Sequence, residues 1–221
     1  MNLTRVRRAQ LVLFSLLSLP LGAAAADAKP LFEASFKQAS PGPLPDGDFL
    51  VLDGAFEIKQ DGGQTFIELP GAPLDTYGVL FGPTRPDGVS VTARIFGTKQ
   101  GRRFPTFAVG LNGAGGYRLQ VSPAKKQIEL LKGDETKIGA PFEWQSDGWT
   151  VLRLQLRKIK DGAWKIEGRA WAHGSPEPTT WNITFDDTEA PAAGRASLWG
   201  APYANTPIRF TDLAVTPAQE K

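Results

Sequence analysis

Long polar side chains alternate with apolar residues along four segments of the chain. Arginine and glutamine present planar hydrogen-bonding groups, and tryptophan offers an apolar platform, so together they suit sugar hydroxyls or acidic groups. If the four segments are neighbouring strands, their polar sides form one continuous face. An ordinary solvated sheet face, or a face on which a partner chain docks, has the same pattern. We predict a ligand-binding face made of Arg94, Arg118, Gln120, Arg153, Gln155, Glu167, Arg169 and Trp171, with His173 at its rim.

Carboxylates that could act as an acid pair are sparse. Asp46 and Asp48 lie in a Pro-rich loop, Asp134-Glu135 in a turn, and Asp186, Asp187 and Glu189 after a strand end, so we predict solvated turn acids at all three places. Glu167 is the best single candidate for a glycan-active enzyme. The chain has no cysteine and one histidine, which excludes thiol catalysis, cysteine metal sites and a histidine metal cluster.

The elements that position these residues are short alternating segments separated by turn residues. The chain has 24 glycines and 18 prolines, and no run of ten or more residues after the first 26 shows a convincing helical stripe. Alternation with frequent turns is typical of a sandwich or barrel. Strands are predicted over 31–36, 49–52, 55–59, 64–69, 78–81, 88–96, 106–111, 116–121, 127–131, 149–159, 195–199 and 208–215.

The stretch Ala163–Phe185 holds three of the six tryptophans and reads as two strands joined by a tight Pro-rich turn. Asp161-Gly162 before it is a hairpin turn signal. Trp164 and Trp181 occupy the same alternating positions as the inward-facing apolar residues, so we predict that both belong to the core. We expect Trp144 and Trp149 to cap the sandwich, and Trp199 to be buried in its glycine-bounded strand.

The first 26 residues have a basic start, an apolar run and small residues, which is the pattern of a secretory signal peptide. We expect residues 27–221 to form one exported domain, periplasmic or extracellular, with no membrane span after cleavage. The segment contains three of the 25 basic residues and none of the 23 acidic ones, so 22 basic and 23 acidic side chains remain. This near balance argues against a nucleic-acid partner.

A longer pattern connects these segments. G-x-W-x-x-E-G-x-x-W and G-x-P-E-P-x-x-W span residues 162–181, and G-R-A-S-L-W-G (194–200) and P-I-R-F-T-D-L-A-V (207–215) follow. This order resembles the concanavalin A-like lectin/glucanase superfamily, and more narrowly exported bacterial laminin G-like or family 16 glycoside hydrolase-like domains. The resemblance covers the chain from about Leu31 to Val215. It implies an all-β, two-sheet antiparallel jelly-roll sandwich that binds glycans on one face.

The resemblance does not carry a glucanase activity, because the E-x-D-x-x-E strand of the family 16 enzymes is absent. The leading hypothesis is a carbohydrate-binding or recognition module with a polysaccharide or glycan partner. An enzyme with a non-standard acid pair and a structural or protein-interaction domain are the alternatives. The resemblance also implies a structural calcium ion at Asp212; no cofactor is otherwise expected.

Overall fold

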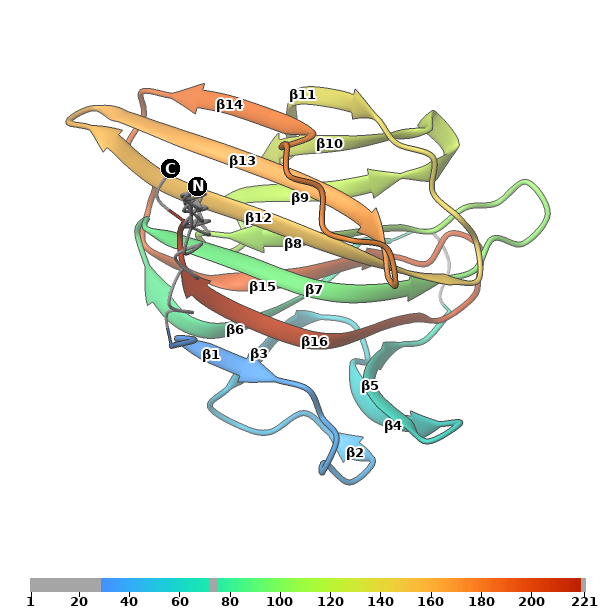
Figure 1. Ribbon diagram of the computed structural model, residues 1–221. Coiled ribbons are helices and arrows are strands. Elements are labelled where there is room, and N and C mark those ends of the chain that lie inside the picture. The colour runs from blue at the N-terminus through green and yellow to red at the C-terminus, as the bar shows by residue number, and fades with distance from the viewer. Residues whose placement is uncertain (1–28, 72–74, 220–221) are drawn as a thin grey trace, which may run out of the picture.

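Two antiparallel sheets lie face to face and enclose one apolar core (Figure 1). The structure is a computed structural model that describes residues 29–71 and 75–219. The predicted signal peptide, residues 1–26, lies outside the described residues. Among the described residues nearly all ordered elements are strands, and a 3-10 turn lies at Pro123–Lys125. The predicted all-β jelly-roll class is therefore confirmed.

Within residues 29–71 and 75–219, the first sheet has nine strands in the order β14-β13-β12-β7-β16-β5-β4-β2, and β1 pairs with the C-terminal part of β16. The second sheet has seven strands in the order β11-β10-β9-β8-β15-β6-β3. The strands of the first sheet are β1 (Phe32–Ala34), β2 (Gly42–Pro43), β4 (Glu57–Asp61), β5 (Gln64–Leu69), β7 (Val89–Gly97), β12 (Gly148–Lys160), β13 (Ala163–Ala172), β14 (Ile183–Asp187) and β16 (Ile208–Pro217). Those of the second sheet are β3 (Phe49–Asp53), β6 (Tyr77–Arg85), β8 (Thr106–Leu111), β9 (Tyr117–Ser122), β10 (Gln127–Lys132), β11 (Glu135–Pro141) and β15 (Gly194–Ala201).

The core is formed by the alternate side chains that each sheet turns toward the other. On β12, Leu152, Leu154 and Leu156 have no exposed surface and pair in register with buried residues of β7. Full burial of each such side chain contributes roughly 1.5–3 kcal/mol. Gly168 on β13 leaves space for Leu119 of the second sheet, whose Cδ1 would lie 2.7 Å from an added Cβ.

A bulge in β16 changes the direction of the side chains around Asp212. The register with β7 shifts between Thr211 and Ala214, and Asp212 adopts a positive φ of 50°. The bulge turns Leu213 into the core and leaves Asp212 exposed on the outer side. Bulges commonly re-aim a side chain in this way.

The two ends of the described chain are joined to each other. Phe32 pairs with Val215 across β1 and β16, and the backbone amide of Leu31 donates to the Val215 carbonyl at 2.8 Å. Figure 1 shows the start of β1 on the same side of the sandwich as the end of β16. No helix among the described residues is long and apolar enough to cross a membrane.

Several sequence expectations need correction. The 163–185 stretch does form two strands, but a ten-residue connection, 173–182, joins them in place of a tight turn. It is long because its residues cross the outer side of the first sheet before β14 begins. The strand β11 was not predicted, since Glu135–Pro141 alternates poorly and lies on a sheet edge.

Candidate functional site

The outer side of the first sheet, formed by β13, β12, β7 and β16, is called the front face below. Its polar side chains form rows across the strands. One row contains Arg169, Arg153 and Thr92, and the next toward the C-terminal end of β13 contains Trp171, Val151 and Arg94. The structure thus brings together the following predicted residues: Arg94, Arg153, Gln155, Glu167, Arg169 and Trp171, with His173 directly after β13.

Arg118 and Gln120 lie elsewhere, so the expected single continuous face is wrong for these two. They belong to β9, on the outer side of the second sheet and across the core from the front face. Arg118 stacks on Trp199, with its Cζ 4.7 Å from the ring centroid, and forms an ion pair with Asp134 at 3.0 Å. Alternation shows that a side chain points away from the core, but it does not show from which sheet.

The part of the front face around Glu167 is closed by internal contacts. Glu167 is 1% exposed, and one of its oxygens accepts from Gln155 Nε2 at 2.7 Å and from Arg157 Nε at 3.0 Å. The backbone amide of Gln219, in the C-terminal tail, donates to Gln155 Oε1 at 3.2 Å. Glu167 therefore acts as a buried partner of its neighbours and does not face an open cleft.

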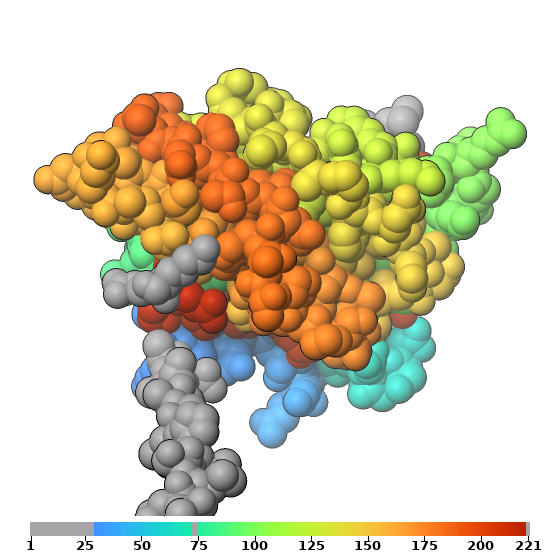
Figure 2. All heavy atoms as spheres, turned by 45° about the horizontal axis from the view of Figure 1, so that its top comes forward, coloured from blue at the N-terminus to red at the C-terminus, as the bar shows by residue number. Residues whose placement is uncertain are grey.

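The 173–182 connection covers the middle of the front face. Glu177 forms ion pairs with Arg153 and Arg169, and the carbonyl of Pro178 accepts from Arg169 Nη1 at 2.6 Å. Trp181, predicted in the core, instead lies under the Arg169 guanidinium with 4.1 Å between Cζ and the ring centroid. Figure 2 shows this segment in orange on the outside of the molecule.

The end of the front face beyond this cover remains open, and we call it the open end. It contains Arg94, Trp149, Trp171 and His173. Arg94 donates from Nη1 to His173 Nε2 at 2.9 Å, so this ring nitrogen is an acceptor, and its Cζ lies 4.9 Å from the Trp149 ring centroid. Both tryptophans are half-buried and His173 is exposed. The expected capping role of Trp149 is wrong, since it belongs to the outer side of β12 and lies 5.5 Å from Phe96.

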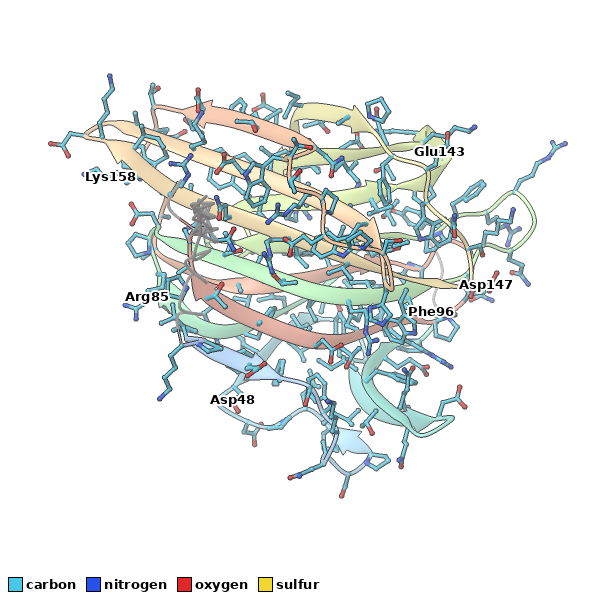
Figure 3. The ribbon with its side chains drawn as sticks, viewed as in Figure 1. Asp48, Arg85, Phe96, Glu143, Asp147 and Lys158 are labelled. Atoms are coloured by element: carbon cyan, nitrogen blue, oxygen red, sulfur yellow. The ribbon has the colours of Figure 1, made fainter. Side chains whose placement is uncertain are left out.

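A small pocket adjoins the open end. It has a volume of about 160 Å³ and is bounded by the 142–145 segment, the start of β12 and the end of β13. Trp149 and His173 line both the pocket and the open end, with Glu143 and Gln145 supplying a carboxylate and an amide. Figure 3 shows Phe96, Glu143 and Asp147 at this end of the sandwich and Arg85 and Lys158 at the other. The arrangement combines aromatic surface with planar polar groups.

The described residues do not fit the calcium ion that the resemblance implies at Asp212. The Asp212 carboxylate faces a cation already, with Oδ2 3.0 Å from Arg94 Nε. Calcium requires six to eight oxygen ligands. No group of three or more acidic or histidine side chains suited to a metal occurs in the part of the chain that the structure describes.

A second polar cluster lies at the opposite end of the sandwich. Asp187, expected as a solvated turn acid, is largely buried and accepts from Tyr117 Oη at 2.6 Å and Lys132 Nζ at 2.9 Å. Burial alone would raise the pKa of Asp187, but hydrogen bonds from Tyr117, the Glu189 amide and Lys132 outweigh it and lower this pKa to about 2. Asp186 matches the expectation, being exposed and paired with Lys165.

The remaining tryptophans divide between core and surface. Trp164 is buried in the core as predicted, and its Nε1 donates to Asp87 at 2.9 Å. Trp144 packs against Phe107 at the core edge. Trp199, expected in the core, is half-buried on the outer side of the second sheet, because Leu198 next to it takes the inward position.

Comparison with solved structures identifies the fold. A Bacillus subtilis protein of unknown function with a galectin-like fold matches with a TM-score of 0.61 and 12% identity, covering 89% of this chain and 99% of that one. The carbohydrate-binding module CBM66 from Bacillus subtilis matches with a TM-score of 0.52 and 12% identity over 79% and 99% of the two chains. The catalytic domain of a glycoside hydrolase family 131 protein from Coprinopsis cinerea matches with a TM-score of 0.55 and 8% identity, covering 87% of this chain and 96% of that one.

The chain therefore has a galectin-like jelly-roll sandwich fold, in agreement with the fold that the sequence resemblance implied. Its structural neighbours include carbohydrate-binding modules and a glycoside hydrolase domain, at identities that establish the fold alone. No protein-family profile matches the sequence, and no curated protein matches it.

Proposed function

We propose that this protein is an exported carbohydrate-binding module that holds its glycan at the open end of the front face. The observation that carries the proposal is the joint presence there of Trp149 and Trp171, both half-buried, with Arg94 and His173. An indole ring fits the apolar side of a pyranose, and guanidinium and imidazole groups hydrogen-bond to its hydroxyls. Export is proposed on the basic, apolar and small-residue order of residues 1–26.

The fold of the neighbours supports this proposal, and so does the shape of the surface. The pocket beside Trp149 is small, which suits the end or side group of a glycan that lies mainly along the open end. Catalysis receives less support, because Glu167 is buried among Gln155 and Arg157. We therefore place binding ahead of glycan hydrolysis.

The test is a glycan array probed with residues 27–221, followed by titration of any glycan retained. Trp171→Ala should weaken binding by at least tenfold, since stacking surface and a hydrogen-bonding neighbourhood are lost together. Trp199→Ala is the matched control, because Trp199 is also half-buried but lies on the other sheet. Equal losses in the two variants, or retention of no glycan, would refute the proposal. N-terminal sequencing of protein recovered outside the cytoplasm tests export.

A further inference from the structure

Two arginines face each other in the middle of the front face. Arg153 and Arg169 are directly opposite in the register of β12 and β13. Like charges in this position destabilise a sheet. The fold places one carboxylate between them: Glu177 Oε1 lies 2.7 Å from Arg153 Nη1 and 2.5 Å from Arg169 Nη2. The pair therefore forms a cradle for an anion.

The cradle is held in place without help from Glu177. Arg153 Nε donates to the Thr92 hydroxyl at 3.1 Å. Arg169 is 7% exposed, lies on the Trp181 ring, and donates to the Pro178 carbonyl at 2.6 Å. Thr92 belongs to the sheet, whereas Pro178 and Trp181 belong to the 173–182 connection, so the sheet and the connection together hold the two guanidinium groups in place.

Glu177 itself comes from the 173–182 connection, outside the strand ladders. Its side chain is about one third exposed, although Oε1, the oxygen between the two arginines, is itself buried. The cradle row lies two residues along β13 from Trp171, a distance of about 7 Å along a strand. An anionic group in the cradle would be next to a glycan on the open end.

We propose that Arg153 and Arg169 form a subsite for the carboxylate of an acidic glycan, such as one built from uronic acids. This inference rests on the proposed function and names its substrate class. The Glu177 carboxylate occupies the subsite in the free protein and acts as a tethered competitor. Tethered groups compete at effective concentrations in the millimolar range or above, so the unaltered chain binds the acidic glycan weakly.

The experiment compares oligogalacturonate with its methyl ester, in which a methyl group on each carboxyl removes the negative charge. Binding of both to residues 27–221 and to the Glu177→Gln variant is measured by isothermal titration calorimetry. We expect Glu177→Gln to bind oligogalacturonate at least about tenfold more tightly and the ester unchanged. Asp186→Asn is the matched control, because it also removes one carboxylate that forms an ion pair with a basic side chain, and it should leave both affinities unchanged. Dextran sulfate and dextran form a second pair that tests sulfate against carboxylate.

The double variant Arg153→Gln/Glu177→Gln should lose the gain, with circular dichroism confirming that it is folded. Suppose the ester binds and this binding depends on Trp171, but Glu177→Gln does not bind oligogalacturonate more tightly. This result would overturn the subsite and leave the proposed function standing. An equal gain in Asp186→Asn, or an equal gain for dextran sulfate, would also overturn it. Absence of binding to oligogalacturonate by all variants would also overturn the subsite, whereas the glycan array decides separately on the proposed function.

Discussion

Asp187 should make the stability of this domain depend on pH in the acid range. Its pKa is about 2 in the folded chain against an ordinary 3.8, because Tyr117, Lys132 and the Glu189 amide donate to its carboxylate. The folded state therefore binds fewer protons than the unfolded state between these values. The stabilisation is complete above about pH 5 and is lost as the pH falls toward 2.

The size of this effect follows from the shift. A decrease of nearly two pKa units corresponds to about 2 kcal/mol, at 1.36 kcal/mol for each unit. Asp187 is only 13% exposed, so solvent screens it little. Asp187→Asn should therefore lower the free energy of unfolding by about 2 kcal/mol at pH 7, and the difference from the unaltered chain should shrink to near zero at pH 2.

Urea unfolding followed by tryptophan fluorescence at pH 7, 5, 4, 3 and 2 measures this difference. Asp186→Asn, one residue away, is the control: its carboxylate is 74% exposed and its ion pair with Lys165 should contribute less than about 1 kcal/mol. A difference for Asp187→Asn that stays constant from pH 7 to pH 2 would show that the carboxylate charge is not what stabilises the cluster.

Two further predictions concern packing. Leu154→Ala should lower the free energy of unfolding by about 2–5 kcal/mol, because Leu154 has no exposed surface and its removal leaves a cavity; a loss below 1 kcal/mol in urea unfolding would contradict the proposed core. Gly116→Ala should lower the free energy of unfolding by roughly 1–3 kcal/mol, since an added Cβ would lie 2.0 Å from the Leu111 carbonyl oxygen. Gly115→Ala is the control and should leave the free energy of unfolding nearly unchanged, because a Cβ added there meets nothing within 4 Å. Equal melting temperatures for these two glycine variants would contradict the described backbone.

Alternation in the sequence was sufficient to predict the fold class and most strands. Leu152, Leu154 and Leu156 face inward and Arg153 and Gln155 outward, because successive side chains of a strand point to opposite faces of the sheet. The Asp161-Gly162 turn between β12 and β13 was also predicted, and Gly162 has the positive φ of 68° that such a turn uses.

The composition of the candidate site could be predicted only in part. The alternation of side chains predicts that Arg118 lies on an outer face. The sheet to which its strand belongs depends on pairing between distant segments, which alternation does not show. Alternation within its own segment predicts that Trp181 faces the core. Trp181 lies outside any strand, however, so the alternation rule does not apply to it. The sequence around Glu177 predicts a turn, and no local signal shows that a loop residue will reach two arginines on neighbouring strands. The outward position of Trp199 could have been predicted, because Leu198 next to it faces inward and adjacent strand residues point to opposite faces.

The pairing of β1 with β16 has a mechanical consequence. The first strand and the last run antiparallel, with the start of one beside the end of the other. Tension applied through the two ends would load the bond from the Leu31 amide to the Val215 carbonyl first and then peel the pair open one bond at a time. Such a pair yields at lower force than strands that are sheared, so this seam is where a stretched chain would begin to unravel while the rest of the sandwich stays intact.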